Sequence, residues 1–172
     1  MQKEACVAAS ETERVNAKLA LEAAREGIVL LANEGVLPLR VKKVALFGAG
    51  ARHTAKGGTG SGEVNNRASI SVEEGLERCG VQVTTKDWLD DCDKKMFAEQ
   101  AERDEKIAEI SRRYSVFRFW DLLNAIALPI IYPSGREITE EDVRLSDTDT
   151  AIYVLTRQAG EGIDRRAEKG EY

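Results

Sequence analysis

The segment VALFGAGARHTAKGGTGSGEVN, residues 44–65, decides the fold. It opens with four apolar residues that do not alternate with polar ones, which is typical of a buried central strand. A glycine-rich loop follows that strand. A second apolar run, AIYVLT at residues 151–156, leads into RQAGEGIDRR at residues 157–166. Parallel strands of one sheet end at the same edge, where ligands of open α/β sheets bind. The sequence therefore predicts that the two loops form one site.

Helix signals precede the first strand. Ser10 and Glu13 have the spacing of a capping box, which predicts a helix over residues 11–33. We expect its buried side to carry Val15, Leu19, Ala23 and the apolar residues 28–31.

The remaining segments extend the same pattern. Ser71 and Glu74 predict a short helix that ends at Gly80. The later elements expected are a strand at 81–85, a charged and mostly exposed helix at 87–113, an apolar helix at 117–128, a short helix at 139–145 and the strand at 151–156. This order predicts an α/β fold, a sandwich with a mostly parallel sheet. We expect residues 1–40 to form an N-terminal helix and lead-in segment, and residues 41–172 a sandwich domain that is cut short.

Composition limits the possible partners. The chain has 172 residues, of which 42% are hydrophobic and 32% charged, with a net charge of −5. Such a charge argues against nucleic acid or an anionic membrane as partner, and no run approaches the ~20 apolar residues that span a bilayer. Cys6, Cys79 and Cys92 lack metal-ligand spacing, so we expect free thiols in a reducing compartment, the cytoplasm, and no metal site.

The glycine-rich loop admits several interpretations. It contains no Walker pattern, and a dinucleotide fingerprint starting at Gly48 would need glycine where His53 stands. A flexible strand-to-helix connection is one alternative. We favour a loop that binds a sugar or another polar ligand, with Ser61 and backbone amides as hydrogen-bond donors. His53 is the only histidine, so the chain alone cannot form a Ser-His-Asp triad. We interpret it as a loop residue rather than a catalytic base.

The second loop presents a carboxylate. Glu161 stands between two glycines, which predicts an exposed side chain at the functional edge of the sheet. A carboxyl group partly buried beside a substrate can act as general acid near neutral pH, and Glu161 suits that role. Asp164 and Arg165 could support the loop as an ion pair. The alternative is a solvated charged loop without catalytic function.

At these residues the chain resembles glycoside hydrolase family 3, the β-glucosidase family. The resemblance rests on four segments in the family's order: AAREGIVLLANEGVLPL (residues 23–39), the strand and loop at 44–65, SVEEGLERCG (71–80) and TRQAGEGIDR (156–165). It implies the family's second domain, a three-layer α/β sandwich of about six strands, of which this chain would hold about three. That domain packs on a barrel that carries the nucleophilic Asp, and nothing in this chain matches the nucleophile.

The resemblance also implies roles for individual residues. Glu161 corresponds to the family's acid/base, and Ser61 lies near the sugar subsite. Weaker candidates for substrate binding are Lys56, Gly57, Gly58 and Glu63. The implied reaction is retaining hydrolysis of β-glucosides by two carboxyl groups and water, which needs no cofactor. Glu63 and Ile163 depart from the family pattern, where Asp and an aromatic residue are common, and the latter change puts substrate preference in doubt.

Two alternatives to a glycosidase fragment follow from the sequence. One is a small α/β module that binds a sugar or nucleotide without catalysis. The other is a structural half-domain that forms homo-oligomers through an open sheet edge or the apolar residues 117–128, since exposed apolar surface favours association.

Overall fold

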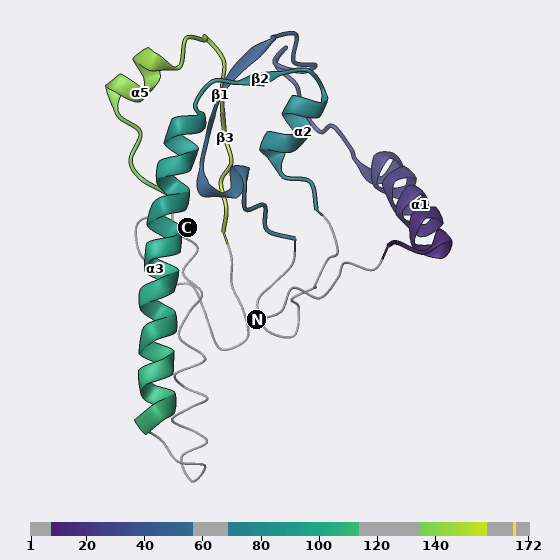
Figure 1. Ribbon diagram of the computed structural model, residues 1–172. Helices are drawn as coiled ribbons and strands as arrows, with labels where there is room; N and C mark the ends of the chain where they lie inside the picture. Colours follow the sequence, from purple (N-terminus) through teal and green to yellow (C-terminus); the bar gives the residue numbers. More distant parts are fainter. Residues whose placement is uncertain (1–7, 57–68, 114–134, 158–166, 168–172) are drawn as a thin grey trace. The chain divides into compact units, whose positions relative to one another are not determined.

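A computed structural model describes residues 8–56, 69–113, 135–157 and 167 of the chain (Figure 1). The chain divides into two compact units, Met1–Arg40 and Val41–Tyr172.

The first unit contains helix α1, Glu11–Gly27. The predicted capping box is confirmed, because the Ser10 hydroxyl accepts a hydrogen bond from the Glu13 amide and the Glu13 carboxylate accepts one from the Ser10 amide. The predicted extension to residue 33 is wrong. Ile28 has an extended backbone, with φ −77° and ψ 122°. Gly27 and the β-branched residues after it are poor helix formers, which explains the early end.

The first unit does not by itself bury the apolar side of this helix. No residue of α1 is buried, and Val15, Leu19 and residues 28–31 are all exposed. Beyond the helix, the side chain of Asn33 organises a turn. Its Oδ1 accepts hydrogen bonds from the backbone amides of Gly35 and Leu37, and its Nδ2 donates to the Leu37 carbonyl. The apolar side chains of residues 15–31 therefore find no core within the first unit itself.

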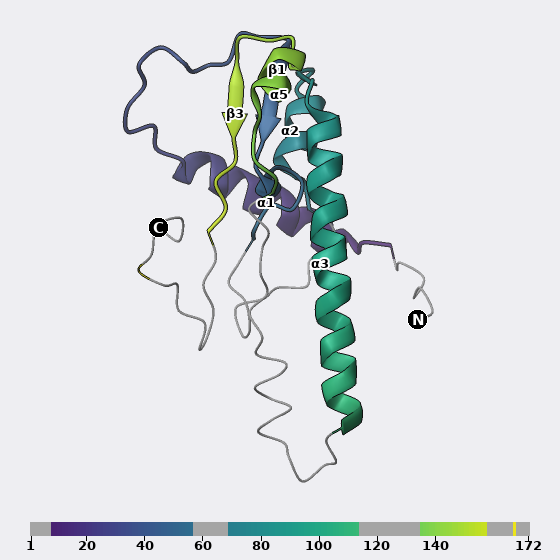
Figure 2. The same cartoon turned by 90° about the vertical axis from the view of Figure 1, so that its left-hand side faces the viewer.

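The second unit is built on a parallel sheet of three strands, β1 (Lys43–Phe47), β2 (Gln82–Val83) and β3 (Ala151–Tyr153). The strand order is β2-β1-β3, and β1 pairs in parallel with both neighbours (Figures 1 and 2). The predicted α/β fold is confirmed. β2 is shorter than expected because helix α3 begins at Lys86, directly after Thr85.

The core lies around β1. Val44 and Leu46 have no exposed surface, and Phe47 packs edge-on against Trp88, with the ring centroids 5.2 Å apart. The buried Thr85 hydroxyl donates to the Leu46 carbonyl at 2.7 Å and accepts from the Leu46 amide at 2.9 Å. The backbone amide and carbonyl of the fully buried Leu46 therefore both have hydrogen-bond partners, as buried polar groups require.

Helices follow the strands as predicted. They are η1 (Ala49–Ala51), α2 (Val72–Arg78), α3 (Lys86–Arg113) and α5 (Glu140–Leu145). The C-terminal half of α3 runs past the carboxyl ends of the strands (Figures 1 and 2). The helix expected at residues 117–128 lies outside the described residues. No described helix is long and apolar enough to cross a membrane.

A half-buried ion pair joins Arg136 to Asp142 of α5, and Arg136 also contacts α3. Arg136 lies over the Trp88 ring and binds both oxygens of Asp142, at 2.6 and 2.7 Å. These contacts, and further bonds from Thr139, hold the pKa of Asp142 well below its usual range.

Because the folded-state pKa of Asp142 is depressed, its contribution to stability is present above the unfolded value of about 3.9 and is lost as pH falls through the folded value. We expect Asp142→Asn to be less stable than the wild type at pH 7, with the gap closing toward pH 2. Urea midpoints at pH 7, 4 and 2 measure this, with Asp149→Asn as the control outside the pair. A gap that stays constant over this range would contradict it.

Candidate functional site

The two predicted loops begin side by side at the carboxyl edge of the sheet. The Val154 amide donates to the Phe47 carbonyl at 2.8 Å, so the chain leaves β1 and β3 in register. Gly48 has φ +94°, and a Cβ there would lie 2.3 Å from the Val154 carbonyl oxygen. A Cβ on Gly50 would lie 1.8 Å from Oγ1 of Thr156. Only glycine permits this close approach, and the two loops are in contact from their first residues.

Most of the residues predicted to act in this site lie outside the described residues. These are Gly57, Gly58, Ser61, Glu63, Glu161, Asp164 and Arg165, and their roles stay predictions. Lys56 is described and exposed. It follows the anchored start of the glycine-rich loop and directly precedes the residues proposed to bind sugar.

An arginine fastens the start of the glycine-rich loop to two helices. Arg52 binds Glu73 of α2 through Nε at 2.6 Å and Nη2 at 3.2 Å. Its Nη1 donates to Asp90 at 2.5 Å and to Asp93 at 3.0 Å, both on α3. The pKa of Arg52 is raised above its usual range, chiefly by the hydrogen bond to Glu73. This guanidinium therefore stays charged at neutral pH.

The next two residues are also anchored. His53 Nε2 lies 2.9 Å from an Asp93 oxygen, and the imidazole meets the ring of Phe97 edge-on. The Thr54 hydroxyl donates to the Gly50 carbonyl at 2.9 Å and accepts from the Val72 amide. Sequence reasoning missed the pairing of His53 with Asp93, because the partners lie 40 residues apart with no motif joining them.

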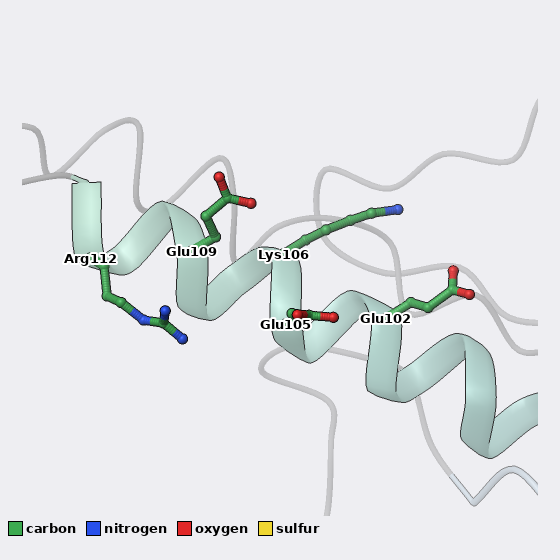
Figure 3. Close-up of a pocket in the computed structure, with 5 residues that line it drawn as sticks. All are labelled: Glu102, Glu105, Lys106, Glu109 and Arg112. Carbon is green, nitrogen blue, oxygen red and sulfur yellow. The ribbon is translucent and has the colours of Figure 1, made fainter.

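The second unit also has a hollow on the surface of α3. It is lined by five side chains of α3, Glu102, Glu105, Lys106, Glu109 and Arg112 (Figure 3). All five are charged and none is aromatic, so this lining lacks the flat apolar surface on which a sugar ring stacks. We therefore keep the candidate site at the ends of β1 and β3.

The described residues contain two of the three cysteines. No group of three or more His, Cys, Asp or Glu residues among them could hold a metal ion. Cys79 and Cys92 are free thiols. Burial raises the pKa of the Cys92 thiol, which disfavours the reactive thiolate. Cys6 lies outside the described residues.

The chain is similar to known proteins along most of its length. Residues 28–169 match the family described as "Glycosyl hydrolase family 3 C-terminal domain". The chain belongs to this family. It is 34% identical over 165 residues to β-glucosidase A of Butyrivibrio fibrisolvens, a match that covers 90% of this chain and 17% of that protein.

The family-3 fold is also found among solved structures. β-Glucosidase 3B from Thermotoga neapolitana in complex with α-D-glucose matches with a TM-score of 0.59 and 34% identity, over 94% of this chain and 20% of that one. The same enzyme in complex with glycerol matches with a TM-score of 0.57 over 92% of this chain. The chain thus spans about a fifth of the length of these relatives, and the part it spans is a family-3 C-terminal domain of the β-glucosidase type.

Proposed function

We propose that this chain is the part of a retaining β-glucosidase-like enzyme that supplies the acid/base, Glu161, and a sugar-binding glycine loop. The observation that carries the proposal is the contact between the two loops at their origins, Gly48 against Val154 and Gly50 against Thr156. Catalysis by Glu161 on a sugar held by residues 56–63 requires the two loops to start at one edge, and they do.

The proposed chemistry uses two carboxyl groups. In retaining hydrolysis these groups lie about 5–5.5 Å apart, one as nucleophile and the other as acid and then base. Glu161 would protonate the departing glycosidic oxygen and later take a proton from the attacking water. No motif in this chain supplies the nucleophile, so we propose that an Asp on a barrel domain of the same enzyme provides it. No cofactor takes part in this scheme.

The sugar contacts are proposed for the glycine loop. Ser61, Gly57 and Gly58 would offer a hydroxyl and backbone amides, and Lys56 and Glu63 would bind sugar hydroxyls through their charged groups. Asp164 and Arg165 would hold the loop of Glu161. A β-D-glucoside is the proposed substrate, since one related enzyme has been solved with glucose bound.

An assay of two proteins tests this proposal. We expect no measurable turnover of an aryl β-glucoside by residues 1–172 alone, because the covalent step lacks its nucleophile. A longer protein from the same reading frame, with a barrel and its Asp, is expected to release glucose with retained configuration, followed by NMR of the anomeric proton. Robust turnover by the short chain, or inversion by the longer one, would contradict the proposal.

A further inference from the structure

The cluster around Arg52 is more negative than an ion pair requires. One guanidinium meets three carboxylates, those of Glu73, Asp90 and Asp93, which leaves a net charge of −2 before His53 is considered. Arg52, Glu73 and Asp93 are largely withdrawn from solvent, with side chains 19%, 13% and 24% exposed. Such groups lose hydration on folding, so a partly buried ion pair is weak evidence of a contribution to stability.

The hydrogen bonds of the cluster determine the orientation of the Arg52 side chain. The guanidinium is planar, and its fork binds both oxygens of Glu73 on α2 while its remaining nitrogen reaches α3. A point charge such as lysine cannot make this two-sided arrangement. Arg52 therefore sets how the backbone of residues 48–56 lies between the two helices.

The backbone of residues 48–56 begins the glycine-rich loop and contacts the start of the Glu161 loop. Gly48 and Gly50 contact Val154 and Thr156, and Arg52 follows two residues after Gly50. Lys56 comes four residues after Arg52. A rotation of this segment would move Lys56 and would also displace Gly48 and Gly50, which lie close against the start of the Glu161 loop.

We infer that Arg52 is a positioning residue of the site: it orients residues 48–56 so that the glycine loop binds sugar in register with the acid/base loop. The inference rests on the proposed function for its sugar. The residue acts through the backbone, without touching substrate, and Asp93 assists by holding His53 as well.

Hydrogen exchange in residues 1–172 tests the positioning itself. The His53 amide donates to the Ala49 carbonyl and reports on the segment, while the Ala45 and Thr84 amides report on the sheet. We expect Arg52→Gln to lower the protection of the His53 amide by about tenfold or more, since hydrogen bonds to charged groups commonly contribute that much, with the sheet amides unchanged. Arg52→Lys should fall between, and Arg144→Gln, at an exposed pair on α5, should change nothing.

Kinetics of the longer enzyme test the consequence for sugar. With an aryl β-glucoside, Arg52→Gln is expected to lower kcat/KM on the order of 10²-fold, as a small misplacement of binding groups does, mostly by raising KM. Arg52→Lys should recover part of the loss. If Arg52→Gln fails to fold, Arg52→Gln/Glu73→Gln removes the unpaired carboxylate of Glu73 and serves in both assays.

The outcomes separate this inference from the proposed function. Unchanged His53 protection, or loss of protection spread evenly over the sheet, overturns the positioning role. Local loss of protection with an unchanged KM overturns its importance for sugar. A wild-type longer protein that hydrolyses no glucoside refutes the proposed function, and the exchange result then still decides whether Arg52 positions residues 48–56.

Discussion

Leu46→Ala is expected to lower the free energy of unfolding by about 2–5 kcal/mol, the range of Leu→Ala changes in well-packed cores. Leu46 is fully buried in the central strand, with β2 on one side and β3 on the other. Its removal would leave a cavity that none of the three strands can close without losing its hydrogen bonds. Since small domains are stable by only about 5–15 kcal/mol, the loss is a large share of the total.

Urea denaturation followed by tryptophan fluorescence measures this change, because Trp88 belongs to the same core. Leu145→Ala is the matched control, since the Leu145 side chain is 62% exposed at the end of α5. The control should change stability by less than about 0.5 kcal/mol, as surface substitutions usually do. Equal losses at the two positions would show that β1 is not the centre of the core.

The sequence predicts well where a local rule decides the structure. Both capping residues, Ser10 and Ser71, start helices within one residue of the expected position. The unalternated run from Val44 to Phe47 is a buried central strand, because a strand covered on both faces needs apolar side chains throughout. The parallel pairing of the three strands follows from the helices between them.

Prediction fails where the outcome depends on tertiary contacts. Residues 28–31 are apolar, and periodicity alone extends the helix through them, but the helix ends at Gly27 and the first unit does not bury them. A pattern of apolar residues states what a segment would bury and not whether a surface is present to cover it. The anchoring of Arg52 is invisible for a related reason: its partners Glu73 and Asp93 stand in unrelated helices, and charged residues are common throughout the chain.

Of the candidate site, the sequence predicts only where its two loops begin. The common edge of the two loops follows from parallel strands, and the contact of Gly50 with Thr156 bears that part out. The distance from Glu161 to the sugar or to a nucleophile does not follow from the sequence, because no local rule determines a distance between groups that stand far apart in the sequence. The role of Glu161 therefore has to be tested by its chemistry.

Glu161→Gln, made in the longer protein, is expected to reduce hydrolysis of alkyl β-glucosides by about 10²–10⁴-fold, the usual contribution of a general acid–base group. The amide keeps the size of the carboxyl group but cannot deliver a proton to the leaving oxygen. Glu140→Gln, an exposed glutamate of α5, is the matched control and should retain full activity.

The dependence on leaving group distinguishes an acid/base from a residue that merely shapes the site. A dinitrophenyl leaving group departs without a proton, so formation of the glycosyl-enzyme should be nearly as fast in Glu161→Gln as in the wild type. Its breakdown should then be slow, because water lacks a general base, and a burst of dinitrophenol should precede a low steady rate. Azide needs no deprotonation and is expected to restore turnover as the β-glucosyl azide. If Glu161→Gln loses activity equally on both leaving groups, without a burst or azide rescue, Glu161 is not the acid/base.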